Sequence, residues 1–288
     1  MPERIERVGV VGCGLMGSGI AEVCARAGLD AVVVEADDNA LTRGRGRIEA
    51  SLARAVRSTK LSGDEREAAL GRITFTTDYE LFVDRQLVVE AVVESEPVKL
   101  AVFSRLDDII ADPGAILASN TSSIPIMKLA MATKRPAQVV GLHFFNPVPV
   151  LALVEVISSL LTDPGVSAAA EAFATQQLGK HPIRSQDRAG FIVNALLIPY
   201  LLSAIRMLES GFATAADIDT GMVEGCAHPM GPLRLTDLIG LDTTMAVAIS
   251  LYDEFKEPLY APPPLLSRMV DAGLLGRKSG RGFYNYGG

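Results

Sequence analysis

Gly12-Cys13-Gly14-Leu15-Met16-Gly17 is the stretch that decides the fold of this chain of 288 residues. A short apolar run of strand type, Val8–Val11, precedes it, and Ser18–Ala27 follows with the apolar spacing of a helix. A second apolar run, Ala31–Val34, ends on the carboxylate of Glu35. The three glycines therefore have G-x-G-x-x-G spacing in a strand–turn–helix–strand setting that closes on an acid.

Each part of this stretch has a physical role. Gly12 permits a tight turn, Gly14 lets a pyrophosphate approach the backbone, and Gly17 allows close helix–strand packing. The helix N-terminus offers free N–H groups to the phosphates, and Glu35 can accept hydrogen bonds from a ribose diol while repelling a 2′-phosphate. The stretch predicts dinucleotide binding, with NAD favoured over NADP, by Gly12, Gly14, Leu15, Met16, Gly17 and Glu35.

The composition is that of a globular protein able to bury a large core, with 49% hydrophobic and 21% charged residues. The net charge of -7 gives no case for binding nucleic acid or an anionic membrane. The three cysteines lack metal-ligand spacing and fit a reducing cytoplasm. We expect neither a signal peptide nor a membrane span, because the N-terminus is charged and no apolar run is long enough.

Strands and helices alternate through residues 1–185, which predicts an α/β Rossmann-type domain with a doubly wound, mostly parallel sheet. Further strands are expected at Ile73–Thr76, Leu87–Val93, Ala115–Ala118, Gln138–Phe145 and Leu151–Ile157, and further helices at Pro97–Ala111 and Pro164–Leu178. A helical hairpin at about residues 38–71 interrupts the alternation. Its basic residues are Arg43, Arg45, Arg47, Arg54, Arg57 and Lys60. They form either a solvated helix face or a platform for an anionic ligand tail.

Residues 186–288 are expected to form an all-helical domain for substrate binding and dimerisation. Its apolar helices suit packing against another subunit. Helices are predicted over Gly190–Leu208, where Pro199 should introduce a kink, and over Ala215–Glu224, Pro232–Phe255 and Pro264–Ala272. A strand is predicted in the tail, Gly282–Tyr286.

Candidate catalytic residues follow the strands, where ligands of open α/β sheets bind. His143 is one of only three histidines, so it is a candidate base, although a satisfied core histidine fits equally well. Ser119–Ser123, taken alone, fits a helix cap with a turn before Pro125 better than it fits a catalytic site. Glu155 favours the catalytic interpretation, because a lone carboxylate in an apolar run needs a partner and His143 is the nearest one. Such a dyad suits alcohol-to-ketone chemistry, in which His143 takes the hydroxyl proton.

The chain resembles the 3-hydroxyacyl-CoA dehydrogenase family, especially its short single-function 3-hydroxybutyryl-CoA members, over essentially its whole length. Besides the glycine stretch, the motifs that carry the resemblance are Ser119-Asn-Thr-Ser-Ser123, His143-Phe-Phe-Asn-Pro147, Gly190-Phe-Ile-Val-Asn194 and Lys278-Ser-Gly-Arg-Gly-Phe-Tyr284. The resemblance implies an oxidoreductase of fatty acid metabolism, such as β-oxidation. It would interconvert 3-hydroxyacyl-CoA, of short chain length, and 3-oxoacyl-CoA with NAD, as a cytoplasmic homodimer joined through the helical domain.

The resemblance also implies a role for each matching residue. His143 would be the general base and Glu155 its orienting acid, while Ser122 and Asn194 would bind the reacting substrate. The residues that would contact NAD beyond the glycine stretch are Glu94, Lys99, Asn120, Asn146 and Lys278. Ser51 matches a CoA-contacting serine. The lysine that accompanies this serine in the family falls on Ser58 here, which leaves Arg57 and Lys60 as candidate replacements.

Two other functions compete with this interpretation. A β-hydroxyacid or phosphogluconate type of dehydrogenase would need a catalytic lysine four residues after Asn194, where this chain has Ile198. A non-enzymatic NAD-sensing or structural protein would be expected to have lost His143, Glu155 or Ser122, and all three are present.

Overall fold

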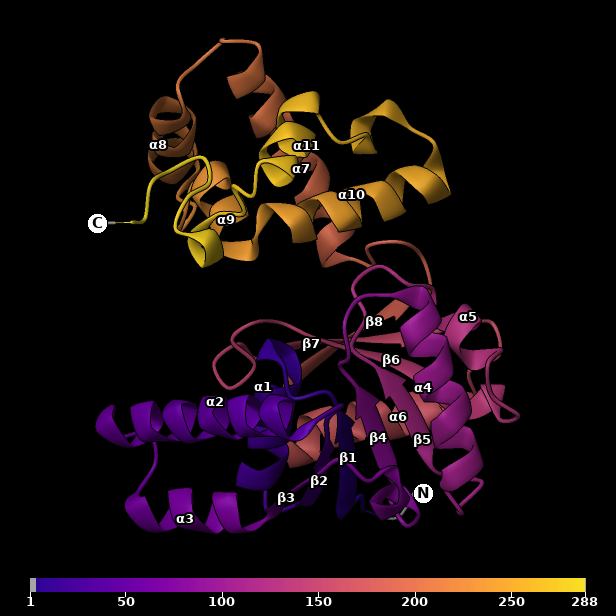
Figure 1. Cartoon of the computed structure of the whole chain (residues 1–288). Helices are drawn as coiled ribbons and strands as arrows, with labels where there is room; N and C mark the ends of the chain where they lie inside the picture. The colour runs from indigo at the N-terminus through magenta and orange to yellow at the C-terminus, as the bar shows by residue number, and fades with distance from the viewer. Residues whose placement is uncertain (1–3, 288) are drawn as a thin grey trace. The chain divides into compact units, whose positions relative to one another are not determined.

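The computed structural model describes residues 4–287. These residues form two compact units that divide after Arg188. Figure 1 shows that the first unit contains the sheet and the second is built from helices. Each unit has its own apolar core.

The first unit is organised around one sheet with the order β3-β2-β1-β4-β5-β6-β7-β8. All neighbouring strands are parallel except β6 and β7, which run antiparallel. The predicted mostly parallel, doubly wound sheet is confirmed. The strands are β1 (Arg7–Val11), β2 (Asp30–Val34), β3 (Ile73–Thr76), β4 (Leu87–Glu90), β5 (Ile116–Ser119), β6 (Val139–Phe144), β7 (Leu153–Ser158) and β8 (His181–Gln186).

Helices cover both faces of this sheet because its strands are apolar on both sides. Val8, Val10 and the alternate residues of the other strands share one core with α1, α2 and α6. The opposite face meets α5, since a Cβ on Gly141 would touch Ile126. The helices are α1 (Leu15–Arg26), α2 (Asp38–Arg57), α3 (Gly63–Gly71), α4 (Glu96–Ile109), α5 (Ile126–Ala130) and α6 (Pro164–Ala172), with 3₁₀ turns at Tyr79–Phe82 and Pro136–Gln138.

The end of this unit differs from the prediction. The helix expected over Pro164–Leu178 changes to a π-helical turn at Phe173–Gln177. No local pattern indicated the strand that follows, β8, because it contains Pro182 and lacks a regular alternation of buried and exposed residues. It pairs with β7 alone in the described sheet, and an edge strand tolerates proline.

The second unit consists of α7 (Val193–Glu209), α8 (Ala215–Cys226), α9 (Pro232–Ile239), α10 (Leu241–Phe255) and α11 (Pro264–Asp271), with 3₁₀ turns at Pro258–Tyr260 and Arg277–Ser279. Helix α7 begins later than predicted, because Gly190 and Phe191 both have positive φ angles. It continues through Pro199.

Two further predictions for this unit were wrong. The single helix expected over Pro232–Phe255 is broken at Gly240, whose φ is 104°. The tail forms isolated bridges at Arg281 in place of a strand; its backbone N–H groups at Phe283 and Tyr284 bond the buried carboxylate of Asp237. Among residues 4–287, no single helix has the length and apolar character to span a membrane; α9 and α10 have them only as a pair bent by 97°.

Candidate active site

The centre of the site is a buried pair formed by His143 and Glu155. The antiparallel register of β6 and β7 sets these two residues directly opposite each other. His143 Nδ1 lies 2.7 Å from Glu155 Oε2, and the two residues are 4% and 0% exposed. The partnership that the sequence predicts is therefore present in the structure.

Ser122 occupies the other side of the imidazole ring. Its Oγ lies 2.9 Å from His143 Nε2. Because a carboxylate only accepts hydrogen bonds, Glu155 assigns the proton to Nδ1 and leaves Nε2 as the acceptor. Nε2 can thus accept a proton. It lies beside the Ser122 hydroxyl, and this is the position that a general base needs if Ser122 also binds the reacting oxygen.

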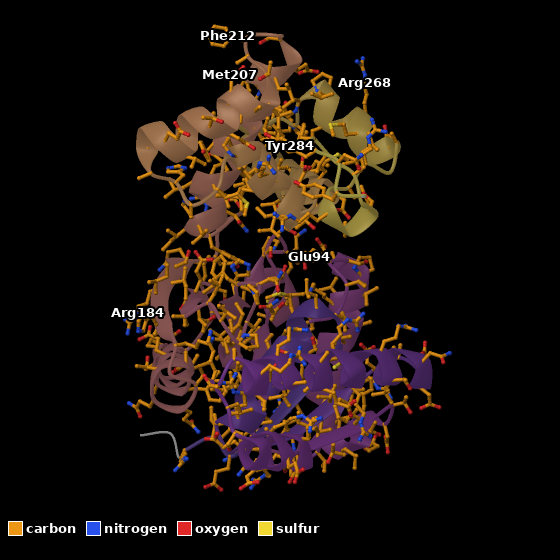
Figure 2. The ribbon with its side chains drawn as sticks, turned by 90° about the vertical axis from the view of Figure 1, so that its left-hand side faces the viewer. Glu94, Arg184, Met207, Phe212, Arg268 and Tyr284 are labelled. Atoms are coloured by element: carbon orange, nitrogen blue, oxygen red, sulfur yellow. The ribbon has the colours of Figure 1, made fainter. Side chains whose placement is uncertain are left out.

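The turn that carries Ser122 is held by Glu94. Glu94 Oε1 accepts hydrogen bonds from the Thr121 hydroxyl at 2.5 Å and from the N–H groups of Ser122 and Ser123, both at 3.0 Å. Burial acts to raise the pKa of Glu94, but the Lys99 ammonium and the nearby hydroxyls outweigh it and hold the pKa below its usual value. Glu94 lies at the carboxyl-terminal edge of the sheet (Figure 2).

Lys99 lies behind this turn in a buried ion pair with Glu90. Lys99 Nζ is 2.6 Å from Glu90 Oε1 and 3.3 Å from Glu94 Oε2, and its side chain is 1% exposed. The other oxygen of Glu90 accepts the Ser119 hydroxyl at 2.7 Å, and Ser119 in turn accepts the N–H of Thr121. Burial raises the pKa of Glu90, and Lys99 partly offsets this effect.

Sequence reasoning did not assign a role to Glu90. Glu90 lies inside the apolar run predicted as a strand, Leu87–Val93, so the cost of a lone carboxylate, which predicts a partner for Glu155, applied to Glu90 as well. The available signal was a lysine nine residues later on the following helix, α4, whose N-terminal part returns to the same edge of the sheet.

The glycine turn has the geometry that its spacing predicts. Gly12 has a φ of 89°, and a Cβ on Gly17 would overlap the carbonyl oxygen of Gly12. A Cβ on Gly14 would meet nothing within 4 Å, so the backbone there is open to a ligand. Glu35 lies beside the turn and accepts the N–H of Cys13 at 2.5 Å. These residues fit a dinucleotide, which needs an open backbone and an acid at the end of the second strand.

The remaining predicted residues divide between the two units. In the first unit, Asn120 accepts the N–H of Phe144 at 2.8 Å, and Asn146 precedes a cis-proline at the end of β6. Leu15 is exposed at the start of α1, and Met16 packs on the core. In the second unit, Asn194 lies in the first turn of α7, and Lys278 is paired with Asp242 at 2.5 Å.

A basic cleft of about 590 Å³ opens between α1, α2 and the loop after β6. Ser51 and Asn146 line it, together with three cations on one face of α2, namely Arg43, Arg47 and Arg54. Arg57 and Lys60, the replacements that the sequence suggested for the missing lysine, are not among its lining residues. Arg43, Arg47 and Arg54 are therefore the cations of the basic hairpin that are placed to meet a ligand in the cleft.

Comparison with known proteins identifies the family. The profile described as "3-hydroxyacyl-CoA dehydrogenase, NAD binding domain" matches residues 7–188, and that of the C-terminal domain matches residues 190–286. The chain belongs to the 3-hydroxyacyl-CoA dehydrogenase family. It is accordingly an oxidoreductase that acts on 3-hydroxyacyl-CoA with NAD.

Relatives within this family match over most or all of their length. The chain is 61% identical to a 3-hydroxybutyryl-CoA dehydrogenase of Mycobacterium tuberculosis, covering 99% of this chain and 100% of the relative. It is 44% identical to human mitochondrial hydroxyacyl-coenzyme A dehydrogenase, covering 98% and 91%. Among solved structures, M. tuberculosis FadB2 superposes with a TM-score of 0.98 at 61% identity, covering 99% of this chain and 100% of that one. Ralstonia eutropha (S)-3-hydroxybutyryl-CoA dehydrogenase PaaH1 gives 0.93 at 45% identity, covering 99% and 100%.

Proposed function

We propose that this family member is an NAD-specific 3-hydroxyacyl-CoA dehydrogenase that acts on short acyl chains and uses His143 as its general base. The observation that carries the proposal is the Ser122–His143–Glu155 arrangement, which leaves a basic Nε2 beside a hydroxyl group. A non-enzymatic NAD sensor has no need of this assembled triad, so we do not favour that alternative.

Within this proposal, each residue of the chain has a defined part. His143 Nε2 takes the proton of the 3-hydroxyl group, and Ser122 holds the oxygen while its charge develops. Glu155 keeps the imidazole in the productive tautomer and stabilises the imidazolium that forms. NAD, when bound, supplies the hydride acceptor. In the reductive direction the same groups act in reverse, and His143 returns the proton.

Support for the cofactor assignment comes from the carboxyl-terminal edge of the sheet. Gly12, Gly14, Leu15, Met16 and Gly17 would face the pyrophosphate, and Glu35 would bind the ribose diol, which disfavours the 2′-phosphate of NADP. Glu94 is assigned to the nicotinamide end of NAD. Lys99 would act indirectly, through its ion pair with Glu94, because its ammonium is already paired with Glu90. Asn120, Asn146 and Lys278 are assigned to the same ligand.

Substrate binding is assigned to residues of both units. Asn194 would hydrogen-bond the thioester side of the substrate, and Ser51 would contact CoA in the basic cleft. The name of the 3-hydroxybutyryl-CoA dehydrogenase of Mycobacterium tuberculosis, to which the chain is 61% identical, supports a short acyl group. We also propose a homodimer joined through the helical unit, where Phe212 is 80% exposed and points outward (Figure 2). The free cysteines support a reducing, cytoplasmic setting.

The direct test follows the near-ultraviolet absorbance of NADH in the presence of acetoacetyl-CoA. We expect rapid loss of NADH with this ester, much slower loss of NADPH, and no turnover of free acetoacetate, because the CoA part contributes binding energy that positions the reacting carbon. A series of longer 3-oxoacyl-CoA esters measures the chain-length preference. Higher kcat/KM for a long chain than for acetoacetyl-CoA would contradict the short-chain assignment.

The cleft makes a separate prediction about which arginine binds CoA. Arg54→Met should raise the KM for acetoacetyl-CoA roughly tenfold, equivalent to about 1.4 kcal/mol, with kcat nearly unchanged. Arg57→Met removes the same charge from the same helix but outside the lining of the cleft, and should leave KM near the wild-type value. The reverse pattern would assign CoA to the other face of α2.

A further inference from the structure

Glu22 is the one carboxylate among the described residues that line the basic cleft. It projects from α1, whereas the three cations of the cleft come from α2. Arginine does not titrate near neutral pH. Any ionisation within the cleft at such a pH therefore belongs to Glu22 or to a bound ligand.

The surroundings of Glu22 satisfy only part of an ionised carboxylate. Its side chain is 1% exposed, and the Nη1 atom of its partner Arg26 is 3.4 Å from Oε1. In the part of the chain that the structure describes, Oε2 is buried without a hydrogen-bond partner. Burial raises the pKa of Glu22, while Ser51, Arg26 and Arg54 act in the opposite direction. A buried polar atom without a partner in a native protein calls for an explanation.

The explanation lies in the competition for Arg54. Glu22 and Arg54 line the same cleft, and an ionised Glu22 attracts the Arg54 guanidinium, for which an entering phosphate would have to compete. The carboxylate also repels that phosphate through a poorly screened interior. When Glu22 is protonated, both effects disappear.

We propose that Glu22 is a positioning residue of the CoA cleft, which acts through Arg54 so that ionisation of Glu22 weakens binding of the CoA phosphates. This inference rests on the proposed placement of CoA in the cleft.

Among residues 4–287, charged groups from several elements act on Glu22 or on its partner Arg26. From its own helix Glu22 faces Arg26, and from α2 it faces Ser51 and Arg54. On α3, Glu65 acts on Arg26, and hydrogen bonds to Ser62 hold the pKa of Glu65 below its usual range. Burial lowers the pKa of Lys180, but this lysine interacts with Arg26 and not with Glu22. Ligand affinity should therefore rise as the pH falls through the titration of Glu22.

The test compares the intact wild-type protein with Glu22→Gln, which keeps the shape of the side chain and removes its charge. Binding of adenosine 3′,5′-bisphosphate, the phosphate-bearing end of CoA, is measured by calorimetry from about pH 5 to about pH 9. At the alkaline end we expect Glu22→Gln to bind roughly three- to tenfold more tightly, with the ratio of the two affinities approaching one as the pH falls. The ratio cancels the ionisation of the probe itself.

The matched control is Glu49→Gln. Glu49 is a partly exposed acid of α2 that pairs with Arg45 outside the cleft, so the ratio of Glu49→Gln to wild type should stay near one throughout. With acetoacetyl-CoA and NADH, Glu22→Gln should lower KM at alkaline pH and leave kcat unchanged, which a general loss of packing would not do.

Three results would overturn the inference. Equal affinities of Glu22→Gln and wild type at every pH would show that the charge of Glu22 does not reach the ligand. Weaker binding by Glu22→Gln at alkaline pH would show that the carboxylate supports the ligand. If neither protein binds the bisphosphate although acetoacetyl-CoA is turned over, the placement of CoA in this cleft fails while the catalytic assignment stands.

Discussion

His143→Gln is expected to lower kcat for acetoacetyl-CoA reduction by at least about a hundredfold while leaving the affinity for NADH close to wild type. The imidazole is the group in the Ser122–His143–Glu155 arrangement that is placed to exchange a proton with the reacting oxygen. Glutamine fills a similar space and can still bond Ser122, but it cannot take up the proton. The glycine turn and Glu35 do not depend on His143, so cofactor binding should persist.

Steady-state kinetics and fluorescence titration with NADH measure the two quantities separately. His181→Gln is the control, because His181 is exposed at the start of β8 and has no part in the proposed site. It should retain wild-type kcat. Turnover by His143→Gln within a fewfold of wild type would remove His143 from the role of base.

The same reasoning shows why this part of the site could be predicted from the sequence. An ionisable residue inside an apolar strand is costly, and the chain offered few partners for Glu155. The short connection from His143 and the tendency of neighbouring strands to pair then placed the two side chains together. The glycine turn was predictable for a similar reason: Gly12 has a positive φ angle, and Gly17 leaves no room for a Cβ beside the carbonyl oxygen of Gly12.

Other features left no comparable trace in the sequence. The break between α9 and α10 depends on a positive φ at Gly240, within a pattern that resembles one continuous apolar helix. Strand β8 exists because β7 offers it an edge, and not because of its own propensity. Glu22 looks like a solvated acid along the chain, and only tertiary packing makes it buried. Local sequence patterns cannot show that a side chain is buried when the residues that cover it come from distant parts of the chain.

The buried pair of Glu90 and Lys99 gives the largest expected effect on stability. Lys99→Met should lower the free energy of unfolding by about 3–5 kcal/mol, the usual cost of removing one partner of a buried ion pair. Glu90 would keep its bonds to Ser119 and Val92 but would lose its contact with the Lys99 ammonium. Urea denaturation followed by circular dichroism measures the change. Lys134→Met is the control, since Lys134 pairs with Asp108 in an exposed position and should change stability little.

Two further results separate the charge of Glu90 from a simple loss of packing. The double variant Glu90→Gln/Lys99→Met should recover most of the lost stability, because it leaves no charge of this pair buried. In Lys99→Met, the folded-state pKa of Glu90 should rise further above its unfolded value, so stability present at low pH is lost as the pH rises through that pKa. The deficit should therefore shrink in acid. The loss of unfolding free energy in Lys99→Met could instead be independent of pH and persist in the double variant. That result would mean that Lys99 stabilises the protein by packing, and that the Ser119–Thr121 turn does not depend on the Glu90–Lys99 ion pair.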